Sequence, residues 1–401
     1  MHSATPSREM LNPLDAFDIS SSPGQEKSLS AVGHDNGNEG TDFSHGDVGA
    51  FPPIPGSFEL LHKAFTDGRR YAYSRYRGHQ EIREYLAPHV AEFTGRSLDA
   101  SSEIIVTPGT QGALFLALSA IAGPGDKVAI VAPDYFANSR IVAYLRAQPI
   151  EVTLHYENPA RPCELNLDEL KAAFDAGARL LVLSNPNNPT GVVYSAAQIH
   201  EIAALAEKYG AFVVIDQLYS RLIYPNVTFT HLRAATDRCI TLLGPSKTES
   251  LSGFRVGIAI GEPSIIDRME KLQALVSLRA AGYSQAVLRC WFSEPAGWMN
   301  RRIHEHQAIR DALYRTFDAT PGISVRRTEG GSYMFPRLPN MRISVDEFRT
   351  RLRNEYGITV TPGDEFGSGY GYSIRLNFSQ QRDKALDAVS VICELVQGLA
   401  T

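Results

Sequence analysis

The chain has 401 residues, of which 43 % are hydrophobic and 21 % are charged, and its formal net charge is −5. So many apolar residues exclude a protein that is disordered throughout. The slight acidic excess argues against nucleic-acid binding through overall charge.

The four cysteines stand far apart and form no CxxC pair. This spacing argues against a disulfide framework or a cysteine zinc site, so we expect no metal. No apolar run approaches the ~20 residues that span a bilayer, and the first residues lack the pattern of a signal peptide. We therefore expect a cytoplasmic protein with no membrane or nucleic-acid partner.

Residues 1–41 are rich in Ser, Gly, Asn and Asp and show no sustained period, which predicts a disordered tail. Order is expected to begin near Phe43. The following Ala50-Phe-Pro-Pro-Ile-Pro-Gly56 is predicted to be an extended connection, because its prolines are incompatible with a helix interior.

From about residue 102, short apolar strands alternate with helix-like segments. Strands are predicted at 104–107, 127–131, 180–184, 211–216 and 258–261, and helices include 113–121 and 196–209. Continuous apolar strands between helices are typical of a mostly parallel sheet with helices on both faces, so the fold class is α/β.

After about residue 264 the helices lengthen, and short strands such as 373–378 indicate a smaller α+β domain. We divide the chain into a tail (1–41), an N-terminal arm that joins the small domain (42–72), a large domain (73–285) and a small C-terminal domain (286–401).

Ligands in parallel α/β sheets bind beyond the carboxyl ends of the strands, so the loops there are informative. Gly109, Thr110 and Gln111 open a helix directly after the first strand, which suits a phosphate, although an ordinary turn also explains them. Tyr135 follows the second strand and is suited to lie flat on a planar ring, although ordinary packing is an alternative.

The next three loops carry stronger signals. Two Asn-Pro turns in Asn185-Pro-Asn-Asn-Pro-Thr-Gly191 deliver Asn188 as a rigid donor. Asp216 ends a buried strand, where a carboxylate needs a cation or donors, unless it merely caps a helix beside a packed Tyr219. Lys247 stands eight residues before Arg255, a pattern that suits an amine nucleophile beside a phosphate clamp, although loop lysines are common.

Together with Ile374-Arg375-Leu376, these motifs resemble the class I/II pyridoxal-phosphate-dependent aminotransferases of fold type I, the aspartate-aminotransferase-like family. The resemblance extends from about Phe43 to Val396. It implies catalytic roles for Lys247, Asp216 and Tyr219. The cofactor-binding residues that it implies are Gly109, Thr110, Gln111, Tyr135, Asn188, Asp216, Tyr219, Ser246, Lys247, Arg255 and Tyr73, and the substrate-binding residues are Gly46, Asn188 and Arg375.

By this resemblance, Lys247 forms an aldimine (a Schiff base) with the cofactor and then moves the α-proton as general base and acid. Asp216 faces the pyridine nitrogen, while Tyr219 and Asn188 bond the phenolic oxygen of the ring. Arg375 grips the substrate α-carboxylate with a two-point fork that lysine does not reproduce.

The resemblance also implies a homodimer with shared active sites, because a tyrosine at the spacing of Tyr73 reaches the neighbouring subunit's cofactor in this family. Tyr71 and Tyr76 lie close enough to leave that choice open. Gln217 replaces a common glutamate, with little expected effect. Gly244 replaces a phosphate-binding serine of some members.

The sequence thus predicts a transaminase that moves an amino group between an L-amino acid and a 2-oxo acid. A lyase or cyclase dependent on pyridoxal phosphate is the alternative, because the same residues serve those reactions. A transcriptional regulator on this scaffold is disfavoured, because residues 1–41 are too short and not basic enough for a DNA-binding module. Arg279 is either a ligand for an acidic substrate or, as we favour, a structural residue.

Overall fold

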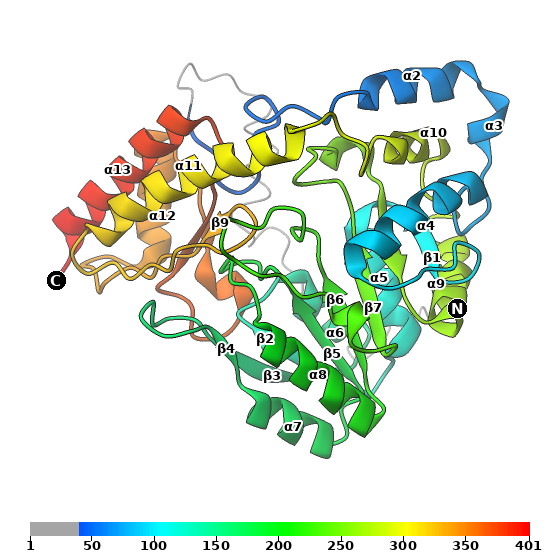
Figure 1. Cartoon of the computed structure of the whole chain (residues 1–401). Coiled ribbons are helices and arrows are strands. Elements are labelled where there is room, and N and C mark those ends of the chain that lie inside the picture. The colour runs from blue at the N-terminus through cyan, green and yellow to red at the C-terminus, as the bar shows by residue number, and fades with distance from the viewer. Residues whose placement is uncertain (1–39) are drawn as a thin grey trace, which may run out of the picture.

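The structure, a computed structural model, describes residues 40–401. It contains an eight-stranded sheet flanked by helices and a three-stranded sheet covered by long helices (Figure 1). The predicted tail therefore lies almost entirely outside the described residues. Thr41, at the end of that predicted tail, is buried, and its carbonyl accepts a hydrogen bond of 3.0 Å from the Thr359 amide.

The large sheet is mostly parallel, as predicted. β6 pairs in parallel with β5 and β7, and β2 with β3 and β5, whereas β8 is antiparallel to both of its neighbours and β4 is antiparallel to β3. Across the sheet the strands are β1 (Ile104–Thr107), β8 (Gly257–Ile260), β7 (Cys239–Leu243), β6 (Phe212–Asp216), β5 (Leu180–Ser184), β2 (Lys127–Ala132), β3 (Gln148–His155) and β4 (Glu164–Leu165).

Helices cover both faces of this sheet, which explains its continuous apolar strands. In β5, Leu181 and Leu183 belong to one hydrophobic cluster, and Leu180 and Val182 belong to another on the opposite face. The first cluster is closed by α7 (Leu167–Asp175) and α8 (Ala196–Tyr209), and the second by α5 (Gly109–Ile121), α6 (Ala137–Tyr144) and α9 (Pro263–Val276). Adjacent residues of a strand face opposite sides, so a strand covered on both sides is apolar throughout.

The smaller α+β domain has its own core. Three long helices pack with the sheet β10–β11–β9, and Phe43 and Phe51 from the N-terminal segment join the same cluster. The helices are α11 (Trp298–Asp318), α12 (Val345–Tyr356) and α13 (Arg382–Leu399), and the strands are β9 (Tyr333–Met334), β10 (Thr361–Pro362) and β11 (Ile374–Asn377).

The N-terminal segment contacts both cores: Phe43 and Phe51 pack in the small-domain core, and the residues after them pack on the large domain. Ile54 packs with Ile82, Trp291 and Trp298 in a cluster that also contains residues of β1 and β8. Residues from both sides of the predicted boundaries at 72/73 and 285/286 therefore pack together in this cluster. The remaining helices of this region are α2 (Ser57–Thr66), α3 (Arg69–Ala72), α4 (Gln80–Thr94) and α10 (Gly282–Gln285).

Four short 3-10 turns complete the described elements: η3 (Leu232–Ala234), η4 (Ser252–Phe254), η5 (Ala286–Arg289) and η6 (Gly363–Phe366). Within residues 40–401, none of the helices has the length and apolar content to cross a membrane.

Candidate active site

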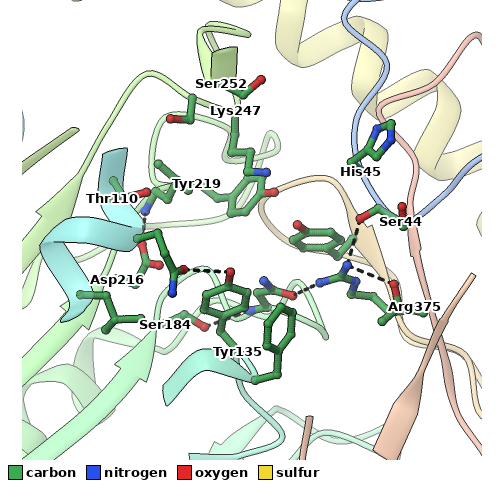
Figure 2. A pocket seen from close by; sticks show the side chains of 18 of the residues that line it. Ser44, His45, Thr110, Tyr135, Ser184, Asp216, Tyr219, Lys247, Ser252 and Arg375 are labelled. Carbon is green, nitrogen blue, oxygen red and sulfur yellow. Dashed lines mark hydrogen bonds between the residues drawn. The ribbon is translucent and has the colours of Figure 1, made fainter. Parts of the chain in front are cut away.

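A cleft of about 330 Å³ opens where the carboxyl ends of the large-sheet strands face the small domain. Figure 2 shows Lys247, Tyr219, Asp216 and Arg375 around this one space, although they come from different segments of the chain. The predicted residues that line the cleft are Thr110, Gln111, Tyr135, Asn188, Asp216, Tyr219, Ser246, Lys247, Arg255 and Arg375.

One end of the cleft is a cradle at the N-terminus of α5. Gly109 has φ +72°, and a Cβ there would lie 2.5 Å from Nη2 of Arg255, so the guanidinium packs directly on the glycine backbone. A Cβ on Gly257 would lie 2.7 Å from the Thr110 amide nitrogen. The hydroxyl of Ser246 is buried and has no hydrogen-bond partner among the described residues. Free amides at a helix start, an arginine and an unpaired hydroxyl suit a phosphate.

The absence of a serine at Gly244 has a steric explanation. A Cβ at this position would lie 2.8 Å from Cγ2 of Thr110, which is closer than carbon atoms approach without a shift. The methyl group of Thr110 therefore occupies the space that a serine side chain at 244 would need.

Asp216 is the last residue of β6 and faces the cleft. Its Oδ1 accepts a hydrogen bond of 2.9 Å from the Leu218 amide. Burial raises the pKa of this carboxyl to about 6, although the positive charge of Lys247 acts in the opposite direction. The next side chain, Gln217, has its Oε1 2.8 Å from Nδ1 of His231.

Tyr219 carries a second unpaired group. Its hydroxyl is buried without a hydrogen-bond partner among the described residues, and burial raises its pKa well above the usual value. Its ring lies edge to face with that of Tyr333 at 5.2 Å. Burial acts to raise the pKa of Tyr333, but the positive charges of Arg375 and Lys247 outweigh it and lower this pKa.

Arg375 projects from β11 as the alternation of that strand predicts. Ile374 and Leu376 are fully buried in the small-domain core, while the guanidinium turns toward the cleft. Its Nη1 donates to Oδ1 of Asn188 at 3.0 Å, and its Nη2 donates to the Ser44 carbonyl at 3.1 Å. Its Nε is buried and has no partner among the described residues, which leaves a donor for a carboxylate.

Asn188 and Tyr135 are held by a residue that the sequence analysis missed. The buried Asp134 accepts from Ser184 Oγ at 2.7 Å and from the Tyr135 amide at 2.6 Å. The same Ser184 hydroxyl accepts a hydrogen bond of 3.0 Å from the Asn188 amide. Tyr135 Oη then donates to Oε1 of Gln111 at 3.0 Å. Burial raises the pKa of Asp134 to about 7, although these donors oppose the increase.

Other residues lining the cleft were also missed. They share no sequence motif, and three of them come from small-domain elements that are two to four residues long. They include Ser44, Phe136, Arg140, Tyr333, Thr361 and Glu365. The signals that could have found two of them are proximity to the predicted Gly46, for Ser44, and the glycine pair at 330–331, for Tyr333.

Three predicted residues are not among those that line the cleft of their own chain: Gly109, on whose backbone Arg255 packs, Gly46 and Tyr73. Gly46 lines an adjoining cavity of about 270 Å³ that shares Lys247 with the cleft. Tyr73 is 82 % exposed and is not among the residues that line either cavity. Arg279 donates to the Ser74 carbonyl at 2.7 Å, and its guanidinium lies 5.5 Å from the Tyr73 ring. Arg279 therefore packs against the Tyr73 loop.

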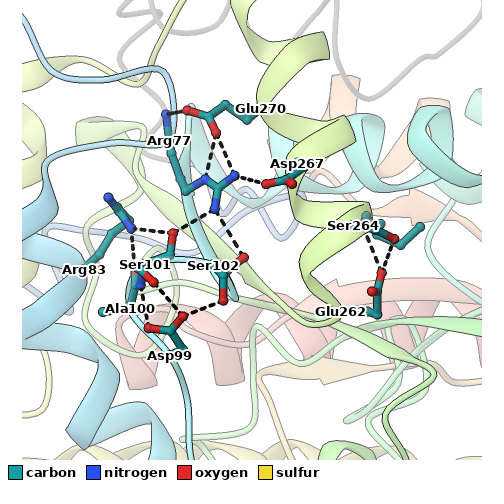
Figure 3. Close-up of polar contacts among 11 residues, drawn as sticks. Arg77, Arg83, Asp99, Ala100, Ser101, Ser102, Glu262, Ser264, Asp267 and Glu270 are labelled. Atoms are coloured by element: carbon teal, nitrogen blue, oxygen red, sulfur yellow. Dashed lines mark hydrogen bonds and ion pairs between the residues drawn. The ribbon is translucent and has the colours of Figure 1, made fainter.

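The base of the Tyr73 loop is anchored by Arg77. Its Nε donates to Glu270 of α9 at 2.8 Å, its Nη1 donates to the Ser101 carbonyl at 2.8 Å, and it also pairs with Asp267 (Figure 3). The loop thus has a fixed base and an exposed tip.

Comparison with known proteins gives this fold and site a family. The model of the family "Aminotransferase class I and II" matches residues 50–391. The chain therefore belongs to the class I and II aminotransferases. It is a transaminase that depends on pyridoxal phosphate and acts on amino acids and 2-oxo acids. The prediction of a fold-type-I enzyme is confirmed.

Individual relatives agree with this assignment. The chain is 28 % identical to an aspartate aminotransferase of Sulfurisphaera tokodaii over 350 residues, which cover 86 % of each chain. It is 27 % identical to an asparagine–oxo-acid transaminase of Streptococcus mutans over 83 % of this chain and 86 % of the relative. Among solved structures, an aspartate aminotransferase from Rhodobacter sphaeroides is 52 % identical, with a TM-score of 0.90 over 91 % of this chain and 93 % of the other.

The cleft fits pyridoxal phosphate. The glycine cradle and the unpaired Ser246 hydroxyl match its phosphate, and the unpaired Tyr219 hydroxyl and the Asp216 carboxyl match polar atoms of a pyridine ring. Within residues 40–401, no group of three or more His, Cys, Asp or Glu side chains is placed to hold a metal ion.

Proposed function

We propose that the chain moves an amino group between an L-amino acid and a 2-oxo acid in this cleft, with Lys247, Asp216 and Tyr219 as its catalytic residues. The observation that carries the proposal is the convergence of Lys247, Asp216 and Arg375 on one space from three separate segments. An amine, a carboxylate and a carboxylate-binding fork together are what amino-acid chemistry on this cofactor requires.

In this proposal, Lys247 holds the cofactor covalently and Asp216 keeps a proton on its pyridine nitrogen. When bound, pyridoxal phosphate supplies an electrophilic carbon for the substrate amine and a ring that accepts the electron pair released at the substrate α-carbon. The other cofactor contacts are those predicted from the sequence, namely Gly109, Thr110, Gln111, Ser246 and Arg255 at the phosphate, Tyr135 on the ring face, Asn188 and Tyr219 at the phenolic oxygen, and Tyr73 from the partner subunit.

In this proposal, different side chains bind the substrate and move its proton. Arg375 binds the α-carboxylate together with Asn188 and the backbone at Gly46, which fixes the α-carbon in front of the Lys247 amine. The Lys247 Nζ would take the α-proton and would later return a proton to the product. The Arg375 guanidinium is already bonded to Asn188 and Ser44, so little reorganisation is needed when a carboxylate arrives.

We further propose a closed two-fold dimer in which Tyr73 completes the partner's cleft. Supporting this, large apolar side chains are exposed on α2, which precedes the Tyr73 loop, and on α9, which anchors its base, and exposed apolar surface is typical of interfaces. They are Phe58 (72 % exposed), Phe65 (68 %), Leu275 (84 %) and Val276 (64 %). A cytoplasmic location is also proposed, because the four cysteines are free thiols.

The test is a half-reaction. Borohydride treatment of the loaded enzyme should fix the cofactor to the peptide that contains Lys247, and Lys247→Ala should escape this labelling. With one amino donor and no acceptor, the enzyme should release one oxo acid per site and stop. A lyase would instead continue to turn over without an added oxo acid, and such sustained turnover would replace the transaminase proposal with the alternative. Amino donors are screened by loss of the absorbance of the lysine-bound cofactor.

A further inference from the structure

The two loops that carry Tyr219 and Lys247 are joined by an ion pair. Tyr219 follows β6 and Lys247 follows β7, and two residues beyond each stands a charged side chain, Arg221 and Glu249. Nη1 of Arg221 donates to Oε1 of Glu249 at 2.7 Å. The Glu249 side chain is 1 % exposed and that of Arg221 is 11 % exposed, so the pair is shielded from water.

A third segment, residues 291–294, also contacts this pair. Nε1 of Trp291 donates to the same Oε1 of Glu249 at 3.2 Å, and the second arm of Arg221 pairs with Glu294. The guanidinium also lies 4.3 Å from the centroid of the Phe292 ring. At its backbone, Glu249 accepts a hydrogen bond of 2.9 Å from the Ile54 amide. Glu249 is therefore fixed at both its side chain and its main chain.

The Lys247 loop has few restraints of its own. Within it, the Ser250 amide donates to the Lys247 carbonyl at 3.0 Å and the Leu251 amide to the Pro245 carbonyl at 3.0 Å. Ser250 adopts a left-handed conformation with φ +57°, which a serine seldom takes. A loop of this kind holds its conformation only when its surroundings fix it, and Glu249 provides the fixed point beside Lys247.

Stability alone is a poor explanation for this pair. Replacing a buried ion pair by apolar side chains is often neutral or stabilising, and Phe292 and Trp291 already offer an apolar environment. The pair instead fixes the two loops relative to each other, because a guanidinium that bonds through two nitrogens fixes direction as well as distance. Reacting groups must be held to within roughly 0.5 Å of the productive arrangement.

We propose that the Arg221–Glu249 pair is a positioning device that fixes the Tyr219 hydroxyl relative to the Lys247 amine. This inference rests on the proposed function of those two residues. Neither Arg221 nor Glu249 lines the cleft, so in this proposal they act only through the loops that they join.

The test uses the loaded enzyme and Glu249→Gln, which keeps the shape of the side chain and removes its charge. We expect the pH midpoint of the absorbance of the lysine-bound cofactor to shift by half a unit or more, in the direction that Tyr219→Phe shifts it. We also expect kcat to fall about 10-fold with KM within about twofold, as displacement of a catalytic group predicts. In a Tyr219→Phe background, Glu249→Gln should add no further shift, because its effect passes through Tyr219.

Asp311→Asn is the matched control. It breaks the pair between Arg310, whose side chain is 5 % exposed, and Asp311, with Nη2 of Arg310 2.6 Å from Oδ1 of Asp311. This variant should lower the melting temperature but leave the absorbance midpoint unchanged. Should Glu249→Gln fail to fold, Arg221→Lys replaces it, because lysine keeps the charge but cannot bridge Glu249 and Glu294 in the same way.

An unshifted midpoint in the folded variant, or a shift fully additive with that of Tyr219→Phe, would overturn the positioning role. Failure of the proposed function is recognised separately, since borohydride would then not label Lys247 in the unmodified enzyme.

Discussion

The cleft and the Tyr73 loop both contain predicted site residues, but those of the cleft face one another, whereas Tyr73 faces solvent. In the cleft, Lys247, Asp216 and Arg375 come from different segments and face one another inside one chain. In the loop, Arg77 and Arg279 fix the base and support the rings, while Tyr73 remains 82 % exposed. A well-anchored loop with an exposed aromatic tip indicates a contact that lies outside the chain. The difference supports the proposal that Tyr73 acts across a subunit interface, whereas Lys247, Asp216 and Arg375 act within their own subunit.

Removing the amine from the cleft should have the largest effect. We expect Lys247→Ala to lower kcat by at least about 10⁴-fold, because the chain then lacks both its covalent anchor and its proton carrier. Stopped-flow measurement of the half-reaction separates this loss from slow product release. A variant that keeps more than one hundredth of the activity would remove Lys247 from the catalytic role.

Asp216→Asn should separate catalysis from stability. We expect kcat to fall by roughly 10²- to 10⁴-fold, because no carboxylate then keeps a proton on the ring nitrogen. At neutral pH the free energy of unfolding should rise, because asparagine avoids the cost of a buried carboxylate. Burial raises the pKa of Asp216 to about 6 in the folded chain, whereas the unfolded value is about 4, so the folded state binds the extra proton between these values.

The contribution of Asp216 to stability is therefore present below about pH 4 and is lost as the pH rises toward 6. In the cofactor-free protein, the difference in free energy of unfolding between Asp216→Asn and the unmodified chain should shift in favour of the variant by about 1–2 kcal/mol from pH 4.5 to pH 7.5. This value is discounted for solvent screening, because the carboxyl faces an open cleft. Urea unfolding at both pH values measures this gain. An equal difference at the two values would contradict the raised pKa.

Arg375→Lys should act mainly on substrate binding. Lysine keeps the charge but loses the fork that contacts Asn188 and Ser44, so we expect KM to rise by about 10- to 100-fold. Arg351→Lys, at a partly exposed arginine of α12, is the control and should leave KM unchanged. A rise in KM that is equal in both variants would indicate a general effect of lysine rather than loss of a carboxylate site.

The Tyr73 loop is tested by mixing chains. In a heterodimer of Tyr73→Phe and Lys247→Ala chains, one site has both an intact Lys247 and an intact partner Tyr73. Random mixing of two impaired variants should therefore restore about a quarter of the activity of the unmodified dimer. Activity is measured after the chains are unfolded and refolded together. A fully active monomer in size-exclusion chromatography would contradict the shared site.

The sequence predicted most of the cleft because its residues follow strands with strong signals. β1 and β5 match the predicted ranges, β2 and β6 differ by one residue at one end, and β8 is shifted by one residue at both ends. Continuous apolar runs bounded by glycine, proline or asparagine are easily delimited. β7 was not predicted, although its residues, Cys-Ile-Thr-Leu-Leu, form a short apolar run of the same kind. β3 was not predicted for a different reason. Its first half contains Gln148, Pro149 and Glu151 and therefore lacks an apolar run.

The small-domain side of the cleft was harder to predict. Arg375 was assigned through the family resemblance of Ile374-Arg375-Leu376. Tyr333 and Thr361, by contrast, lie in strands of only two residues, which have no detectable period. Asp134 was missed because a buried carboxylate that supports a loop has no spacing of its own. Its function becomes visible only when Ser184 and the Tyr135 amide are seen to donate to it.

The smallest effect is expected at the N-terminal end. Removing residues 1–38 should leave folding and cofactor binding unchanged, because the sequence there has no apolar pattern. A deletion that extends through Phe43 is the matched comparison. It removes the pairing of Asp42 with Thr359 and a fully buried aromatic ring of the small-domain core, and should lower the free energy of unfolding by about 2–4 kcal/mol. Because Ser44 and Gly46 lie directly beyond, the longer deletion should also weaken substrate binding at Arg375, whose Nη2 donates to the Ser44 carbonyl. Chemical unfolding and KM of the two truncated enzymes measure both effects. Loss of bound cofactor in the shorter deletion would show that residues 1–38 belong to the folded enzyme.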